Sequence, residues 1–215
     1  MKKQDKVNAV ITALEKQYPD AKCSLEYKEP YELLFATVLS AQCTDKRVNI
    51  VTKELYSKYS TLESIANATP EEIGECIKSC GLYKTKAKNI VASAKILIEK
   101  YNGELPSSIE ELTTLPGVGR KTANLIMGDI FHQPAVVTDT HCLRICNRLG
   151  FTKNTEPYNV EKDLKKLLPP DKSSDFCHRL VLFGREFCSA RNPKCNECPI
   201  KNEYKNEMKC IIKTD

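Results

Sequence analysis

A lysine that follows a glycine-rich turn is the first candidate for chemistry in this sequence. Residues 115–123 read Leu-Pro-Gly-Val-Gly-Arg-Lys-Thr-Ala, and apolar residues with a helical period follow them. Glycine lets the backbone turn tightly and approach a large ligand, and N–H groups at the start of a helix favour a phosphate. An ordinary turn between two helices explains Pro-Gly equally well. The spacing therefore leaves a phosphate-binding hairpin and a plain connection both open.

Lys121 lies in the first turn of the helix that this pattern predicts. The positive end of the helix dipole disfavours a second positive charge there, which favours the neutral amine, the form that attacks carbon. Asp139 follows in the segment Val-Val-Thr-Asp-Thr-His that ends at His141. Its carboxylate suits proton transfer or the stabilisation of positive charge. It would equally cap a helix that begins near His141.

The sequence contains eleven cysteines, and four of them lie close to the C-terminus. These four are Cys188, Cys195, Cys198 and Cys210. Thiolates at the first three spacings suit a soft metal centre, and both zinc and a [4Fe–4S] cluster remain open. The total is odd and no export signal is recognisable, so a disulfide framework fits poorly. The other seven are predicted to be reduced and buried: Cys23, Cys43, Cys76, Cys80, Cys142, Cys146 and Cys177.

The composition is that of an ordinary globular protein. The chain has 215 residues, of which 41% are hydrophobic and 28% charged, which is enough for one sizeable core or two small ones. A formal charge of +5 permits a polyanionic partner without requiring one. No apolar run approaches about eighteen residues, which excludes a membrane span, and the first residues resemble neither a signal peptide nor a transit peptide. We therefore expect a cytoplasmic protein.

Short helices separated by brief turns are predicted almost throughout, and no strand pattern is present. Thr69-Pro70-Glu71-Glu72 is typical of a helix start, with an N-cap, a proline at the first position and acids in the first turn. Pro30 opens an earlier helix in the same manner, and we expect Leu33, Leu34, Thr37 and Val38 of that helix to point inward. Further helices are predicted over about 120–130, 141–149, 159–168 and 173–187. The fold class is therefore all-α.

The hairpin and the segment around Asp139 together resemble the helix-hairpin-helix DNA glycosylases, and most closely the endonuclease III family. Residues 30–34 and 39–45 resemble an early helix of that family and the turn after it. Gly81-Leu82-Tyr83 resembles its wedge loop, and the cysteine tail resembles its iron–sulfur loop. Several ordered motifs over most of the chain are far more specific than the hairpin alone.

The resemblance implies two helical domains. One would span residues 23–133 and contain the helix-hairpin-helix at about 108–127. The other would combine residues 1–22 with 134–215 and carry a [4Fe–4S] cluster on the loop 188–210.

The resemblance also implies base excision repair of duplex DNA by a monomer, in bacteria close to the nucleoid. The enzyme would flip a damaged pyrimidine out of the duplex, and Lys121 would attack the sugar C1′, expel the base and form a Schiff base. β-Elimination would then cleave the strand 3′ to the lesion or to an abasic site, with Asp139 assisting. Related adenine and mismatch thymine glycosylases lack this lysine, and 8-oxoguanine glycosylases lack the cysteine loop.

Family position also implies residues that touch DNA. Gln42 and Leu82 would fill the gap that the flipped base leaves, offsetting an unstacking cost of a few kcal/mol. Four further basic residues could either contact phosphates or lie on the solvated surface, and the sequence leaves both roles open: Lys84, Lys86, Arg144 and Arg148. The remaining implied DNA contacts are Gly117, Val118, Gly119, Arg120 and His141.

The tail departs from the family pattern at the fourth cysteine. That position is Tyr204 here, and the next cysteine is Cys210. Doubling a flexible loop adds only about 0.6 kcal/mol of closure free energy, which is small beside metal–thiolate bonds. We predict that Cys210 is the fourth ligand; a three-cysteine site, a labile cluster and no cluster are the alternatives.

Three rival functions are consistent with parts of the sequence. A non-catalytic helix-hairpin-helix DNA-binding module needs neither Lys121 nor Asp139. A monofunctional mismatch or adenine-type glycosylase would use water in place of the lysine. A structural iron–sulfur protein leaves Gly117 and Gly119 unexplained.

Overall fold

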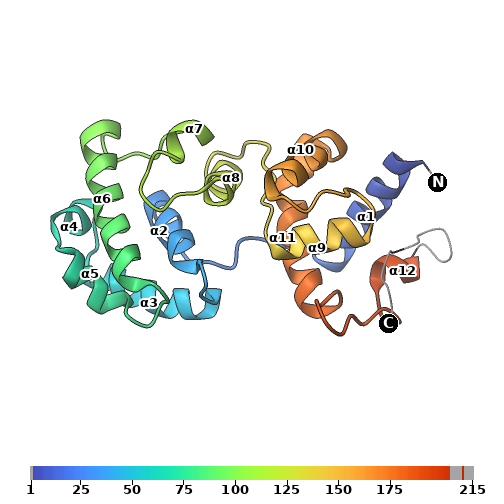
Figure 1. Cartoon of the computed structure of the whole chain (residues 1–215), viewed down its shortest axis with the longest axis horizontal. Coiled ribbons are helices and arrows are strands. Elements are labelled where there is room, and N and C mark those ends of the chain that lie inside the picture. The colour runs from blue at the N-terminus through green and yellow to red at the C-terminus, as the bar shows by residue number, and fades with distance from the viewer. Residues whose placement is uncertain (1, 204–209, 211–215) are drawn as a thin grey trace. The chain divides into compact units, whose positions relative to one another are not determined.

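The computed structural model describes residues 2–203 and 210, and every regular element in this part of the chain is a helix (Figure 1). The all-α prediction is therefore confirmed. The elements are α1 (Lys3–Gln17), α2 (Pro30–Ser40), α3 (Asp45–Lys58), α4 (Leu62–Asn67), α5 (Pro70–Ile77), α6 (Tyr83–Tyr101), α7 (Ile109–Leu112), α8 (Arg120–Asp129), α9 (Thr140–Arg148), α10 (Pro157–Leu167), the short 3₁₀ helix η1 (Pro170–Lys172), α11 (Ser173–Glu186) and α12 (Pro199–Glu203).

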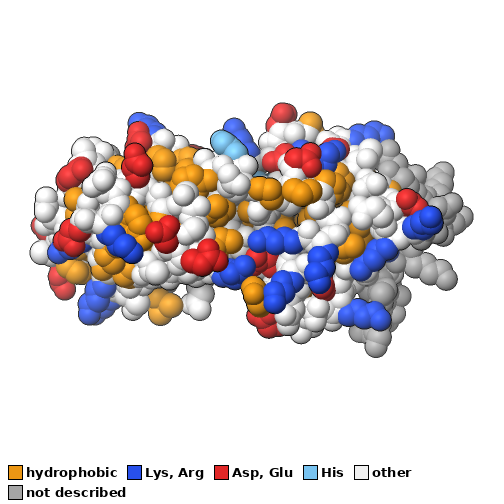
Figure 2. Space-filling view, turned by 90° about the horizontal axis from the view of Figure 1, so that it is seen from above, with side chains coloured by type: hydrophobic (Ala, Val, Ile, Leu, Met, Phe, Trp, Pro, Cys, Tyr) orange, Lys and Arg blue, Asp and Glu red, His pale blue; other side chains and the backbone are white. Residues whose placement is uncertain are grey.

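The chain forms two compact units, each described here by itself. The continuous unit is Cys23–Phe131 and contains α2 to α8. The split unit combines Met1–Lys22 with His132–Asp215 and contains α1 and α9 to α12. Figure 2 shows that Lys and Arg side chains lie among Asp and Glu side chains on the face it presents, in keeping with the small net charge.

The core of the continuous unit is built around α2 and α6. Helix α6 packs against α4 and α5, and α2 packs against α3, α6 and α8. The sequence predicts a single buried face of α2 that includes Leu33, Leu34 and Val38, but the structure buries every residue from Glu32 to Leu39. Neighbours on several sides make α2 a central helix, which is why it is not amphipathic.

Helix starts follow the local signals. Thr69 caps α5 as predicted: its Oγ1 accepts a hydrogen bond from Glu72 N at 3.2 Å, and Glu72 Oε2 accepts one from Thr69 N at 2.8 Å. Ser108 caps α7 in a similar way. Helices α3 and α4 are not among the predicted helices, although Thr44 and Thr61 cap them by the same mechanism.

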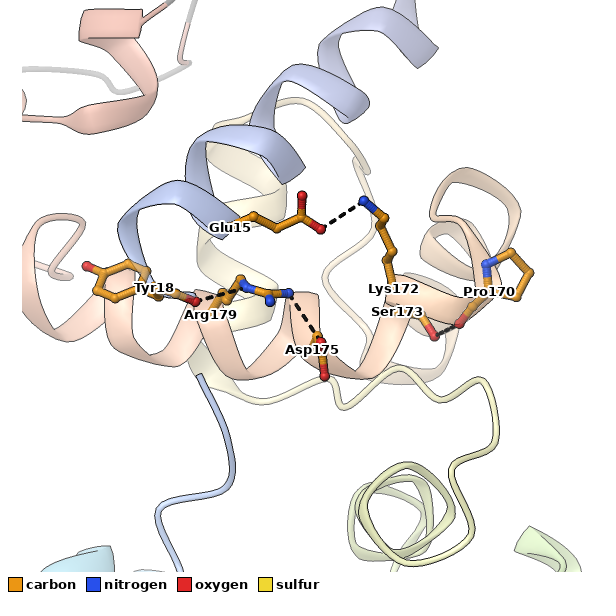
Figure 3. A network of polar contacts seen from close by, with 7 residues as sticks. All are labelled: Glu15, Tyr18, Pro170, Lys172, Ser173, Asp175 and Arg179. Carbon is orange, nitrogen blue, oxygen red and sulfur yellow. Dashed lines mark hydrogen bonds and ion pairs between the residues drawn. The ribbon is translucent and has the colours of Figure 1, made fainter. Parts of the chain in front are cut away.

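In the split unit, polar contacts join α1 and the residue after it to η1 and α11 (Figure 3). Arg179 of α11 donates from Nε to Tyr18 O at 3.1 Å, and its Nη1 lies 3.5 Å from Asp175 Oδ2. Lys172 Nζ lies 2.9 Å from Glu15 Oε1 at the end of α1. Buried apolar residues of α1, among them Val10 and Leu14, complete this core. Residues from both ends of the sequence therefore form one hydrophobic interior.

No helix within residues 2–203 is long and apolar enough to cross a membrane. The scattered cysteines are only partly as predicted. Cys80, Cys142, Cys146 and Cys177 are buried, whereas Cys23, Cys43 and Cys76 are only half-buried. The latter three pack against the core of the continuous unit and are partly buried there.

Candidate active site and metal centre

The glycine-rich turn connects α7 to α8 and is held by α6. Gly117 has φ +80°, a conformation that side chains with a Cβ rarely adopt, and a Cβ there would lie 2.8 Å from Asn89 Nδ2. Ser93 Oγ donates to Pro116 O at 3.0 Å. Glycine is therefore required at 117 both for the backbone angle and for the close packing of α6.

Gly119 serves a different purpose from Gly117. Its φ is −93°, and a Cβ there would meet nothing within 4 Å. As the N-cap of α8 it offers no side chain, so the first-turn N–H groups of α8 have no side-chain cap. Val118 is buried, and its N–H donates to Leu115 O at 3.1 Å, so Val118 stabilises the turn. The arrangement is an open, positively polarised site suited to a phosphate.

Lys121 is the second residue of α8 and is exposed. The next residues, Thr122 and Ala123, are buried, which fixes that face of the helix against the core and turns the lysine outward. Arg120 beside it is also exposed. The amine therefore extends from a rigid helix start directly after the phosphate-binding turn.

Asp139 lies in the split unit and caps α9. Its Oδ1 accepts a hydrogen bond from Cys142 N at 2.7 Å. The residues before it, Val136 to Thr138, are buried, so the chain leading to the carboxylate is held in place. Asp139 therefore does cap the helix, as the sequence allowed. The cap uses Oδ1 and leaves Oδ2 able to interact with a substrate.

His141 is packed within the split unit. Its Nδ1 lies 3.0 Å from Arg144 Nη2, and a Cβ at Gly184 of α11 would overlap the same nitrogen. Glycine at 184 therefore allows α11 to approach the imidazole. Packing and hydrogen bonding explain the position of His141.

Gln42 and Leu82 share an unusual backbone conformation. Their φ angles are 57° and 60°, in the left-handed region that residues other than glycine seldom occupy. Leu82 is 63% exposed, which is unusual for a leucine, and Gln42 is exposed as well. A Cβ at Gly81 would lie 3.6 Å from Gln42 O, so the two segments are neighbours. Strain of this kind tends to persist where function requires it.

Lys86, in α6 after Leu82, forms hydrogen bonds to the backbone just before Gln42. Its side chain is buried, and Nζ donates to Leu39 O at 2.9 Å and to Ala41 O at 2.6 Å. The cation therefore satisfies carbonyls at the C-terminus of α2, where the helix dipole favours positive charge. Neither the phosphate contact nor the solvated surface considered from the sequence applies to Lys86.

Four thiols line one cavity at the end of the split unit. The cavity has a volume of about 410 Å³, and Cys188, Cys195, Cys198 and Cys210 all contribute to it. The pKa of the Cys210 thiol is raised to about 11, chiefly by burial and also by Cys188, Cys198 and Cys195, so the four sulfurs are within electrostatic reach of one another. Within the described residues, no three Cys, His, Asp or Glu side chains converge closely enough for a single metal ion.

Two arginines of α9 shape this loop. Arg148 donates to Ser189 O at 2.7 Å and to Ala190 O at 2.9 Å, and its Nη1 lies 3.2 Å from Cys188 Sγ. Arg144 donates to Cys188 O at 3.0 Å. Both arginines are half-buried and support the cysteine loop, a role that the sequence did not suggest. Their spacing of four residues was the available signal, because it places both on one helix face.

Comparison with known proteins identifies the family. The model for HhH-GPD superfamily base excision DNA repair proteins matches residues 35–170, and that for the iron-sulfur binding domain of endonuclease III matches residues 188–203. Endonuclease III of Synechocystis sp. is 45% identical over 199 residues, covering 92% of this chain and 91% of the relative. Endonuclease III of Bacillus subtilis is 44% identical over 201 residues, covering 91% and 92%. The chain belongs to the endonuclease III family.

Solved structures of endonuclease III extend the similarity to three dimensions. A trapped endonuclease III–DNA covalent intermediate matches with a TM-score of 0.88 and 44% identity, covering 94% of this chain and 95% of that one. A non-covalent endonuclease III–DNA complex matches with a TM-score of 0.89 and 42% identity, covering 98% and 96%. The predicted helix-hairpin-helix glycosylase fold is therefore confirmed.

Membership of the endonuclease III family determines the activity class. The protein is a DNA-binding base excision repair enzyme, a DNA glycosylase with abasic-site lyase activity. It carries a [4Fe–4S] cluster. The monofunctional and non-catalytic alternatives are not favoured.

The donor set suits the cluster. Thiolates are the ligands that iron–sulfur clusters use, and the four cysteines surround a volume instead of meeting at a point. The N–H group of Arg148 near Cys188 Sγ is the kind of neighbour that stabilises a cluster sulfur. The family match ends at residue 203, and Tyr204 lies outside the described residues.

Proposed function

We propose that this endonuclease III family member removes oxidised pyrimidines from duplex DNA through a Schiff base at Lys121. The observation that carries the proposal is the exposed Lys121 amine at the start of α8, next to the uncapped turn at Gly119. A turn that holds the DNA backbone would deliver the sugar to an amine fixed on the same helix. Such positioning converts attack on C1′ into a nearly intramolecular step.

The bond changes follow from an amine nucleophile. Nζ of Lys121 forms a bond to C1′, and the N-glycosidic bond breaks with its electron pair and a proton going to the departing base. The sugar ring opens to an imine, which acidifies the proton at C2′. Loss of that proton breaks the C3′–O bond and cleaves the strand 3′ to the lesion. Water then hydrolyses the imine and releases Lys121.

Asp139 is assigned to charge stabilisation and proton transfer. Positive charge develops at C1′ as the base departs, and a carboxylate of fixed orientation stabilises it. The N-cap at Cys142 N supplies that fixed orientation through one oxygen, leaving the other for the substrate. The same carboxylate would also take part in the proton transfers of the reaction.

The remaining proposed residues bind DNA. The exposed, left-handed Gln42 and Leu82 would occupy the space that the extruded base vacates. Gly117 and Val118 keep the turn in shape and would contact DNA there. Gly119 and Arg120 would contact the backbone phosphates, with His141 as a further contact. We further propose that the enzyme acts as a monomer on duplexes with a damaged pyrimidine or abasic site, in the cytoplasm close to the nucleoid.

Cys188, Cys195, Cys198 and Cys210 are the proposed cluster ligands. When bound, the cluster acts as a structural cross-link for a tail too short to form its own core. Arg144 and Arg148 hold the first turn of the loop, so this chain's own contacts already orient Cys188.

Cys210→Ser is expected to remove most of the iron, because a serine hydroxyl does not replace a thiolate at a [4Fe–4S] site. The purified variant should lose the brown colour and unfold at a lower temperature than the parent protein. Iron content per chain and thermal melting measure both effects. Cys76→Ser, which alters a half-buried cysteine of the continuous unit, is the matched control. Full iron content in Cys210→Ser would place the fourth ligand elsewhere.

A borohydride trapping experiment tests the proposed function. The purified enzyme is mixed with a duplex that contains one oxidised pyrimidine, and borohydride is added to reduce any imine to a stable amine. A covalent protein–DNA band is expected, with peptide mapping placing the adduct on Lys121. Base excision without a band would show that water, not the lysine, is the nucleophile, and an adduct on another residue would overturn the assignment.

A further inference from the structure

Two cysteines that the repair chemistry does not use lie between the segments of Gln42 and Leu82. Cys43 directly follows Gln42, and Cys80 stands two residues before Leu82. The Cys43 thiol donates a hydrogen bond to Cys80, with 3.8 Å between the two Sγ atoms. Neither residue belongs to the cluster loop. The pair is therefore a second group of thiols at the proposed DNA-inserting end of the continuous unit.

The surrounding contacts hold this pair together. Lys86 of α6 donates to Leu39 O and Ala41 O, which fixes the end of α2 against the start of α6. A Cβ at Gly81 would lie 3.6 Å from Gln42 O, so the backbones also approach each other. A disulfide requires an S–S distance of about 2.05 Å. The sulfurs therefore have to move less than about 2 Å closer to bond.

The two thiols differ in accessibility, and this difference determines which of them reacts first. Cys43 is half-buried, whereas Cys80 is buried. The pKa of the Cys80 thiol is raised to about 11, chiefly by burial and also by the hydrogen bond with Cys43, while Lys86 and Arg47 partly oppose this rise. A reagent from solvent reaches Cys43 first. Cys80 is then the second, resolving thiol.

We propose that Cys43 and Cys80 form a modification site that low-molecular-weight disulfides oxidise to an intramolecular disulfide. The Cys43 thiolate attacks one sulfur of the reagent and forms a mixed disulfide, and the reagent's other half leaves as a thiol. The Cys80 thiolate then attacks Cys43 Sγ and releases the second half as a thiol. The protein dithiol loses two electrons and two protons, and the reagent disulfide gains both.

The cross-link restrains the residues proposed to enter DNA, so this consequence rests on the proposed function. It would stand one residue from Gln42 and two from Leu82. Both residues need freedom to adjust when they enter a duplex, because insertion accompanies unstacking and bending. A covalent bridge between their segments limits that adjustment. Closure of the pair is expected to slow cleavage of a damaged duplex by on the order of tenfold.

The chemical part of the proposal is tested by mapping disulfides after treatment with oxidised glutathione in the absence of air. Free thiols are alkylated and the protein is digested with trypsin without reduction. Cys43 is the only cysteine of the tryptic peptide 29–46, and Cys80 the only one of the peptide 79–84. The expected product is these two peptides joined, and it should form equally in Cys76→Ser but not in Cys43→Ser. If both peptides remain alkylated or only glutathionylated, the proposal is wrong.

The functional part is tested on the same samples. Each variant is compared with its own untreated activity on a duplex with one oxidised pyrimidine. Oxidised parent protein and Cys76→Ser should cleave about tenfold more slowly and recover with dithiothreitol, whereas Cys43→Ser should be insensitive to the treatment. A cross-linked protein with unchanged cleavage would refute the regulatory role. Peptide mapping needs no DNA. The disulfide can therefore be detected even if the proposed function at Lys121 proves wrong.

Discussion

Replacing Lys121 by glutamine is expected to abolish strand cleavage and borohydride trapping while leaving lesion binding close to that of the parent enzyme. The substitution removes the amine that bonds to C1′ but keeps the turn at Gly119 and the first-turn N–H groups of α8. Gel electrophoresis of a labelled duplex with one oxidised pyrimidine measures cleavage, and fluorescence anisotropy measures binding.

Stability provides an internal control for this variant. Lys121 is exposed at the positive end of the dipole of α8, so removing its charge should stabilise the protein by about 0.3–1 kcal/mol or leave it unchanged. Lys95→Gln, which removes an exposed charge from α6, is the matched variant and should cleave normally. Undiminished cleavage by Lys121→Gln would eliminate the proposed mechanism. Lost binding together with lost cleavage would assign Lys121 to DNA contact instead of chemistry.

Asp139→Asn is expected to slow base excision by about 10²–10³-fold, the range found when one electrostatic stabiliser is removed. Asparagine is nearly as good an N-cap as aspartate, so the bond from Cys142 N to the side-chain oxygen should persist. The free energy of unfolding of the variant should therefore lie within about 0.5 kcal/mol of that of the parent protein. Single-turnover excision rates and chemical denaturation measure the two quantities.

Asp139→Ala separates the cap from the charge. Alanine removes both, so this variant should lose activity and also about 1 kcal/mol of stability. A role confined to capping predicts the opposite pattern, in which Asp139→Asn excises at the parent rate and only Asp139→Ala is impaired. Equal stability of all three proteins would mean that the cap of α9 contributes nothing measurable.

Much of the fold follows from local sequence. Thr69 and Ser108 start their helices through side-chain oxygens that accept first-turn N–H groups, an interaction within four residues. The interior of α2 was under-predicted because its burial from Glu32 to Leu39 depends on helices that come later in the chain. Helices α3 and α4 were not predicted, although Thr44 and Thr61 supply the same local capping signal as Thr69.

The same division holds for the candidate site. Three features were identified as candidates from the sequence alone, because each is a local pattern of residue types. They are Lys121 after Gly119, Asp139 before α9 and the spacing of the first three tail cysteines. Each depends on neighbours within a few residues. Comparison with relatives then established the activity class without any appeal to tertiary contacts.

Only the tertiary structure decided what the other charged and sulfur-bearing residues do. It buried Lys86 under the carbonyls of α2, and it turned Arg148 toward the cysteine loop, forty-odd residues away in sequence. It also brought Cys43 within 3.8 Å of Cys80 and set Cys210 at the cavity that Cys188 lines. Composition and spacing do not encode these pairings, because a side chain's long-range partner depends on how whole helices pack. The physical reason is that local hydrogen bonds select a helix start, whereas burial of the apolar core selects which distant residues meet.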